Sequence, residues 1–224
     1  MNYILFILLG FCSGSVMYSE IFPYILTGKD IAKLSDDKNP GSSNVFQHTG
    51  IPMGILCLVF DIFKGFLPIL WSLSFCDMEH PLFAVVLAAP VLGHASSFCL
   101  LKVIAPRRFS WMEHTSGKAI AVSFGCLIGL MPESFLVLAL AIPFIFFSVV
   151  LHINPHSYRV IVSFGCFLLL AAIHHCPRAL LLGCFLISTI VIGKHILFLK
   201  DSKESLRINL GLRRKSKEHG NASK

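Results

Sequence analysis

Long apolar stretches separated by short polar connections occupy almost the whole chain. A helix needs about 20 apolar residues to cross the hydrocarbon core of a bilayer, and most of these stretches reach that length. The pattern therefore predicts an all-helical membrane protein that spans the bilayer several times. The apolar stretches cover 2–26, 50–75, 81–104, 119–131, 134–152, 158–174 and 178–199, and only the fourth is short.

Composition supports the same class of protein. Charged residues make up 14% of the chain and hydrophobic residues 55%, with a mean hydropathy of +0.75. A soluble domain carries about 25% charged residues. The first stretch lacks the basic segment that opens a signal peptide, so we expect it to remain as the first span.

The positive charge of the chain is concentrated at its end. The formal net charge is +7, and residues 200–224 alone contain eight Lys and Arg. We interpret this segment as a basic cytoplasmic tail near lipid headgroups, and we expect no nucleic-acid partner.

Loop charges predict the topology. With seven helices and the N-terminus outside, 16 loop and tail Lys and Arg face the cytoplasm, and only Arg178 faces the other side. A six-span arrangement would divide them almost evenly, so the positive-inside rule favours seven spans and a cytoplasmic C-terminus. We expect one membrane domain over 1–199, with cytoplasmic loops at 28–48 and 102–118 and the tail at 200–224.

The loop at 28–48 contains the polar stretch NPGSSNV, which starts at Asn39. Its Pro-Gly pair favours a turn. Successive N–H groups in such a turn, followed by a helix start near Ser43 or Gly50, form a concave site for an anion. The alternative is a helix cap in a solvated loop. The candidate donors are Ser42, Ser43 and Asn44.

Two opposite charges lie inside the second apolar stretch. Asp61 and Lys64 are three residues apart, so they share one helix face and can pair. Charges at membrane depth usually face the bundle interior or a wet cavity. This pair is therefore either part of a functional pathway or a structural ion pair.

A Gly-Lys pair, Gly117 and Lys118, directly precedes the short apolar stretch. Lys118 can present its ammonium group beside a helix start, which suits a phosphate or carboxylate ligand. The alternative is a lysine that extends toward the membrane surface. We interpret His94, which follows a glycine, as a histidine that packs between helices.

Common catalytic and cofactor motifs are absent from the sequence. It has no G-x-x-x-x-G-K-[ST], G-x-G-x-x-G, H-E-x-x-H or G-x-S-x-G pattern. Its eight cysteines lie in or beside apolar stretches without a C-x-x-C pair, so we interpret them as small buried side chains. We expect no cofactor and no metal.

Six polar motifs follow one another along the chain: GS at 14–15, GKDI at 28–31, NPGSSNV at 39–45, DIFKGFLP at 61–68, GH at 93–94 and SGKAIAVSFG at 116–125. Their order resembles a known family, the bacterial acyl-phosphate:glycerol-3-phosphate acyltransferases of the PlsY type. These are small seven-span enzymes of the inner membrane, and the resemblance covers nearly the whole chain.

The resemblance implies transfer of an acyl chain from acyl phosphate to the 1-hydroxyl of glycerol 3-phosphate. The products would be lysophosphatidic acid, for phospholipid synthesis, and inorganic phosphate, without a cofactor. An acyl phosphate is already activated, so the enzyme mainly has to bind two phosphate groups and align the attacking hydroxyl. The implied protein is a monomer surrounded by inner-membrane lipids, with its active site facing the cytoplasm.

The resemblance also assigns roles to residues. Those implied to be catalytic are Ser43, Asn44, Lys118 and His195. Those implied to bind substrate phosphate are Asn39, Gly41, Ser42, Gln47, Gly117 and Lys194. Those with a structural or pathway role are Asp61, Lys64 and His94.

The sequence departs from the family pattern at several positions. Gln47 replaces the arginine that closes the first motif, and Asp36 and Asp37 lie beside the expected anion site. Extra residues occupy 103–115, where Arg107 and Arg108 are candidates for replacing the lost charge, and Phe198 takes the place of an asparagine. Two alternatives therefore remain: a lipid-binding or regulatory protein with lost or altered activity, and a transporter that uses Asp61 and Lys64.

Overall fold

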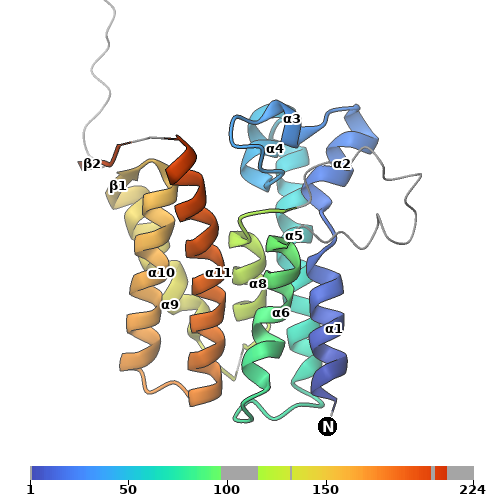
Figure 1. The fold of residues 1–224 in the computed structure, drawn as a ribbon, viewed down its shortest axis with the longest axis vertical. Helices are drawn as coiled ribbons and strands as arrows, with labels where there is room; N and C mark the ends of the chain where they lie inside the picture. The colour runs from blue at the N-terminus through green and yellow to red at the C-terminus, as the bar shows by residue number, and fades with distance from the viewer. Residues whose placement is uncertain (1, 97–115, 132, 203–204, 211–224) are drawn as a thin grey trace, which may run out of the picture.

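The computed structural model describes residues 2–96, 116–131, 133–202 and 205–210, which are mostly helical (Figure 1). Insertion 103–115, most of loop 102–118 and the end of the tail lie outside these ranges. The elements are α1 (Tyr3–Gly14), α2 (Tyr18–Thr27), α3 (Ile31–Leu34), α4 (Ser42–Thr49), α5 (Ile51–Ser72), α6 (Phe83–Ala95), α8 (Ile120–Ile128), α9 (Leu136–Ile145), the π-helical turn η1 (Phe146–Val150), β1 (Leu151–Asn154), α10 (His156–Ile173), α11 (Arg178–Ser202) and β2 (Arg207–Leu210).

The long helices lie side by side along the long axis of the molecule (Figure 1). Within the described ranges, four segments are long and apolar enough to cross a membrane, and two more apolar helices are shorter. Many large apolar side chains point outward, including Ile4 and Ile51, which suits contact with lipid. The four long segments are Tyr3–Thr27, Ile51–Ser72, His156–Ile173 and Arg178–Lys200; the shorter ones are Phe83–Ala95 and Leu136–Val150.

The first apolar stretch is divided into two helices. We expected a single span over 2–26, but α1 ends at Gly14 and α2 begins at Tyr18. A break frees backbone carbonyls, which are costly in an apolar environment without a partner. Lys64 of α5 donates from Nζ to the Val16 carbonyl at 2.7 Å and so satisfies one of them.

Close backbone contacts hold the short helix α8 against α5. A Cβ added to Gly65 would lie 2.4 Å from the Val122 carbonyl oxygen, and one added to Gly125 would lie 2.0 Å from that of Ile62. Small residues that let two backbones approach are typical of helix packing in membranes. These contacts bury most of α8 and position its first turn, which follows Lys118.

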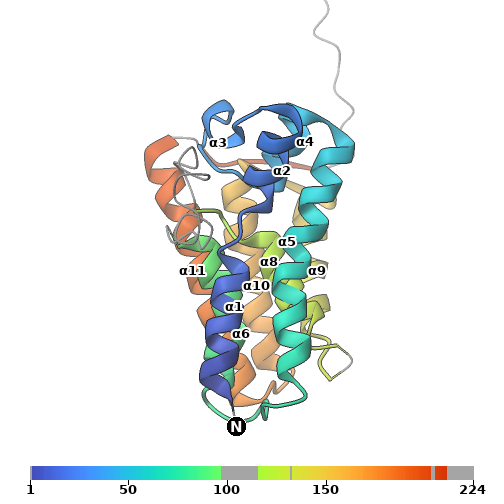
Figure 2. The same cartoon turned by 90° about the vertical axis from the view of Figure 1, so that its right-hand side faces the viewer.

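Helices α2, α3 and α4 form a cap at the end of the molecule opposite the N-terminus (Figures 1 and 2). β1 and β2 lie at this same end in Figure 1 and pair antiparallel, with Leu151 opposite Leu210 and Asn154 opposite Arg207. Within the segment we expected to be a polar tail, α11 therefore continues to Ser202 and a strand follows. This two-stranded ribbon of β1 and β2 connects the region after α11 with the region before α10.

Candidate functional site

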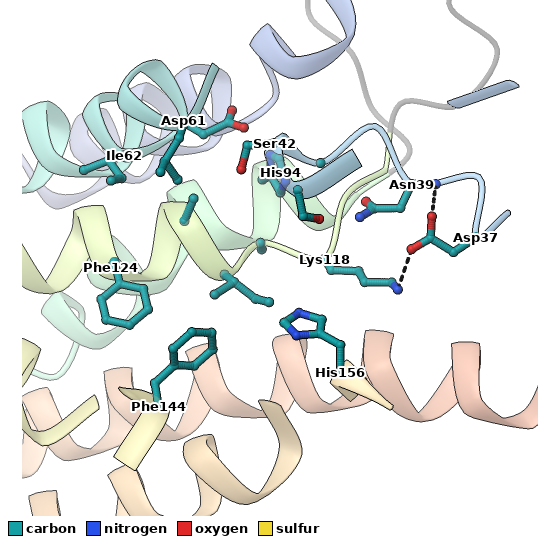
Figure 3. A pocket seen from close by; sticks show the side chains of 16 residues that line it. Asp37, Asn39, Ser42, Asp61, Ile62, His94, Lys118, Phe124, Phe144 and His156 are labelled. Carbon is teal, nitrogen blue, oxygen red and sulfur yellow. Dashed lines mark hydrogen bonds and ion pairs between the residues drawn. The ribbon is translucent and has the colours of Figure 1, made fainter. Parts of the chain in front are cut away.

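A cavity of about 410 Å³ lies beneath the α4 end of the bundle. In Figure 3, Asp37 and Lys118 lie at one end of it, and Phe124 and Phe144 lie at the other. Loop residues before α4 and the start of α8 form its polar end. α5, α8 and α9 supply its apolar part.

A second cavity, of about 430 Å³, adjoins the first. Asn44, Gln47, Ser157, Arg159 and Phe198 are among the residues that line it. The two cavities share part of their lining, so a ligand that reaches both would pass these side chains. The shared residues are Asp37, Ser43, Lys118 and His156.

The first turn of α4 forms one wall of the first cavity. The helix starts at Ser42, one residue from the predicted start at Ser43, and Gly41 is its N-cap. The first N–H groups of a helix have no intrahelical acceptor, and the helix dipole makes this end positive. Ser42 and Ser43 both line the cavity, so this wall can bind an anion.

Asn44 braces the loop before α4. Its Nδ2 donates to Asp37 Oδ1 at 2.8 Å and to the Asn39 carbonyl at 2.7 Å. The Asn39 N–H donates to the same Asp37 oxygen at 3.2 Å. The Asn44 side chain, implied to be catalytic, and the N–H of Asn39, implied to bind substrate phosphate, therefore both donate to a carboxylate of the chain itself.

Lys118 completes this arrangement from the other side. Its Nζ donates to Asp37 Oδ2 at 2.7 Å and lies 3.8 Å from the centroid of the Phe198 ring. The two charged side chains are only 14% and 17% exposed. Asp37 thus occupies the position that an anionic ligand would take, with three donors around it.

The backbone beside Lys118 is tightly constrained. A Cβ on Gly117 would lie 2.1 Å from His94 Nε2, and the Gly117 N–H donates to the His94 carbonyl at 2.9 Å. Ala119, the N-cap of α8, has a left-handed backbone with φ of +60°. Gly117 therefore packs closely against His94, and the roles assigned to both residues stay predictions.

Asp61 and Lys64 form a second, deeper cluster. Their charged atoms are 2.8 Å apart, as the three-residue spacing predicts. Ser19 Oγ donates to Asp61 Oδ2 at 2.6 Å, and Lys64 Nζ lies 2.8 Å from His94 Nδ1. Asp61 and His94 also line the first cavity, so this cluster joins α2, α5 and α6 at its edge.

The predicted residues of α11 support the site from outside the cavities. Lys194 donates to Ser116 Oγ, and His195, which is fully buried, lies 3.0 Å from Ser157 Oγ through its Nδ1. Most of the predicted site residues line one or both cavities: Asn39, Gly41, Ser42, Ser43, Asn44, Gln47, Asp61, His94 and Lys118. The others lie around them: Lys64, Gly117, Lys194 and His195.

These donors suit an anion better than a metal. Among the described residues, no group of three or more His, Cys, Asp or Glu side chains is arranged to hold a metal ion. Ammonium, amide and helix N–H donors instead converge on the polar end of the cavities, and these groups bind phosphate or carboxylate. The apolar part beside Phe124 and Phe144 can take a hydrocarbon chain.

A family model described as glycerol-3-phosphate acyltransferase matches residues 4–201. The chain belongs to this family. Glycerol-3-phosphate acyltransferase 1 of Thermotoga maritima is 37% identical over 118 residues, and the match spans 51% of each protein. The chain therefore covers about half the length of this relative. A Staphylococcus aureus glycerol-3-phosphate acyltransferase is 29% identical over 196 residues, which are 87% of this chain and 91% of the relative.

Solved structures of the integral membrane acyltransferase PlsY have the same fold. The glycerol 3-phosphate form matches with a TM-score of 0.70 and 21% identity, over 92% of this chain and 95% of that one. The lysophosphatidic acid form matches with a TM-score of 0.67. The present chain is therefore a helical membrane protein of this fold, and its identity to the relatives is modest.

The start of α10 contributes to both cavities, although none of the sequence motifs lies there. His156 lines both cavities, and Arg159 lines the second, with its Nη2 2.8 Å from His156 Nδ1. In the sequence, Arg159 is one of the 16 Lys and Arg expected on the cytoplasmic side. The available signal was Asn-Pro-His before an apolar stretch, which marks a helix start, but only the tertiary fold brings it to the cavity.

Proposed function

We propose that this protein transfers an acyl chain from acyl phosphate to the 1-hydroxyl of glycerol 3-phosphate, as a step in phospholipid synthesis. The products are lysophosphatidic acid and inorganic phosphate. Membership of the family supports this reaction. The observation that carries the proposal is the convergence of Lys118, the start of α4 and an apolar pocket on two adjoining cavities.

The reaction needs binding and alignment more than a covalent nucleophile. The acceptor oxygen forms an ester bond to the acyl carbon, the bond from that carbon to the phosphate oxygen breaks, and the hydroxyl proton leaves with phosphate. Lys118 and the N–H groups of Ser42 and Ser43 would hold the negative charge that shifts onto the leaving phosphate. Phe124 and Phe144 would contact the acyl chain, which fixes the carbonyl beside the acceptor.

Asp37 has a defined place in this reaction. Its carboxylate accepts hydrogen bonds from Asn44 and Lys118. In our proposal a substrate phosphate replaces it as the partner of Lys118, and the carboxylate keeps these donors in position between turnovers. The second aspartate, Asp36, lines the second cavity and is exposed.

We further propose seven membrane crossings in a single domain, with the N-terminus outside and the site facing the cytoplasm of a bacterial cell. α1 with α2, α5, α6, α8, α9 with η1, α10 and α11 would be the crossings. In Figure 1 the N-terminus and β2 lie at opposite ends, which fits an odd number of crossings. The cavities lie at the β2 end, and the proposed enzyme is a monomer, as the family resemblance implies.

The direct test is a reconstituted assay. The purified full chain in liposomes should produce lysophosphatidic acid and equimolar phosphate from acyl phosphate and glycerol 3-phosphate. Glycerol and other polyol phosphates offered in parallel would identify the acceptor. A thermal unfolding measurement first shows that the protein is folded. If this folded protein makes no acylated product with any acceptor, the proposal is rejected.

A lipid-binding or regulatory role is the second candidate. The observation that favours it is Asp37 among the anion donors, together with Gln47 where the family pattern has arginine. In that case the protein would retain phospholipid in the assay but make no product. Movement of glycerol 3-phosphate into the liposomes without acylation would instead indicate a transporter.

A further inference from the structure

We propose that Arg159, in the first turn of α10, supplies the guanidinium that binds substrate phosphate in the second cavity, in place of the arginine missing at Gln47. The inference rests on the proposed function, since it names a substrate-binding group for that reaction. It differs from the sequence-based candidates, Arg107 and Arg108, which lie outside the described residues.

The first observation is the shared location of the two residues. Gln47, from α4, and Arg159, from α10, line the same cavity of about 430 Å³. Lys118 and Ser43 line it as well and connect it to the first cavity. A guanidinium from α10 can therefore reach the space that an arginine at position 47 would face.

The second observation is the bonding state of the guanidinium. Arg159 Nη2 lies 2.8 Å from His156 Nδ1, while its Nε is enclosed and has no acceptor among the described residues. Nor does any carboxylate in the described ranges form an ion pair with Arg159. A guanidinium has five N–H donors in a planar fork that matches phosphate, so this side chain retains unused donors.

The third observation is the position of the charge on its helix. α10 has 18 residues, begins at His156 and has no acidic residue in its first turn. The start of a helix is positive, so an arginine there is unfavourable unless an anion lies nearby. The helix start and Arg159 together form a positive site that a phosphate dianion would stabilise.

Neighbouring contacts hold this helix start in place. Ser157, in the first turn of α10, contacts His195 of α11, with 3.0 Å between Ser157 Oγ and His195 Nδ1. β1 directly precedes the helix and pairs with β2. Arg159 is therefore carried by a braced element, as a substrate-binding group requires.

The decisive experiment measures binding of inorganic phosphate, which does not depend on turnover. Full-length protein in nanodiscs is titrated with phosphate for the wild type, Arg159→Ala and Arg159→Lys. We expect Arg159→Ala to weaken binding about 10- to 100-fold, because it removes charged hydrogen bonds, and Arg159→Lys to weaken it less. Arg178→Ala, at the opposite end of the α10–α11 pair, is the matched control and should bind like the wild type.

A charge-relocation variant separates binding from structure. Gln47→Arg in the Arg159→Ala background should recover at least part of the lost affinity, because it returns a guanidinium to the same cavity. A merely structural role for Arg159 predicts no recovery. Thermal unfolding in nanodiscs identifies any variant that fails to fold. If Arg159→Ala does not fold, Arg159→Lys takes its place in the phosphate titration and in the Gln47→Arg rescue.

The outcomes distinguish this inference from the proposed function. Equal phosphate affinity in the wild type and in folded Arg159 variants, or no rescue by Gln47→Arg, would overturn the inference even if the protein makes lysophosphatidic acid. Phosphate binding that depends on Arg159, in a protein that makes no acylated product, would support the inference and reject the proposed reaction.

Discussion

The structure contains two buried or half-buried lysine–aspartate pairs at the first cavity, and they differ in almost every other respect. Lys64 and Asp61 lie on one helix, and their side chains are 1% and 3% exposed. Lys118 and Asp37 are 81 residues apart and are 14% and 17% exposed. We call them the deep pair and the surface pair.

The partners of each pair explain the difference. The deep pair is bonded to Ser19, the Val16 carbonyl and His94, so each charge is satisfied within a fixed set of helices. In the surface pair, Lys118 contacts a loop carboxylate and an aromatic ring beside two open cavities. Similar charge pairs thus have different surroundings, and we propose different roles for them: the deep pair would hold helices together, and the surface pair would exchange with a ligand.

Breaking the deep pair should have the largest effect on stability. Lys64→Met leaves Asp61 buried without its counter-ion and frees the Val16 carbonyl, so we expect a loss of about 3–5 kcal/mol. Thermal or denaturant unfolding in detergent measures it. The double variant Asp61→Asn with Lys64→Met should recover part of the loss. A stability for Lys64→Met close to that of the wild type would contradict the structural role.

Breaking the surface pair should instead reduce activity. Lys118→Ala removes the ammonium group proposed to hold the leaving phosphate, and we expect turnover to fall about 100- to 1,000-fold with little change in unfolding temperature. The liposome assay measures this. Lys33→Ala, which changes an exposed side chain of the loop helix α3, is the control and should behave like the wild type. Near-normal turnover in folded Lys118→Ala would exclude this lysine from the reaction.

Neutralising the aspartate of the surface pair should sharpen the contrast. Asp37→Asn removes the carboxylate that competes for Lys118, and we expect inorganic phosphate to bind about fivefold more tightly. Asp36→Asn changes net charge equally but has no such contact, so it should have a smaller effect. If Asp37→Asn and Asp36→Asn change phosphate affinity equally in a titration, the effect comes from net charge and not from the contact with Lys118. If Asp37→Asn binds phosphate more weakly than the wild type, the carboxylate is needed for the site.

The smallest expected effect concerns the backbone beside Lys118. Ala119 has a left-handed φ of +60°, which is unfavourable for alanine and available to glycine. Ala119→Gly should therefore stabilise the protein by about 0.5 kcal/mol. Ala139→Gly, in the regular helix α9, should destabilise it by about 0.5–1 kcal/mol. Unfolding curves of the two variants and the wild type would measure both changes in stability. If both variants are more stable than the wild type, or both are less stable, this explanation is contradicted.

The deep pair was predictable from sequence, and so were the helical segments, because both depend on local spacing. Apolar runs indicate helices, and a three-residue separation places Asp61 and Lys64 on one face. The start of α4 near Ser43 was also predictable from its turn and polar residues. The break in the first stretch was not, because the side chain that satisfies its carbonyl comes from Lys64, far along the chain.

The surface pair and Arg159 could not be located in the same way. Asp37 looked out of place beside an anion site, and only the fold shows that its oxygens receive donors from Asn44 and Lys118. Arg159 has no local motif, because it shares a cavity with Gln47 only through the tertiary arrangement of α4 and α10. Long-range contacts of this kind are set by tertiary packing and leave no periodic pattern in one sequence.

The β1–β2 ribbon and Phe198 have a consequence for the order of events during synthesis. The second cavity draws its walls from residues that begin at Leu34 and end at Phe198. A ribosome makes the donor loop first and the closing helix last, so a nascent chain that has inserted most of its helices still lacks one wall. Completion of the site therefore coincides with insertion of the last helix and pairing of the strand behind it, and chains released early would have no finished cavity.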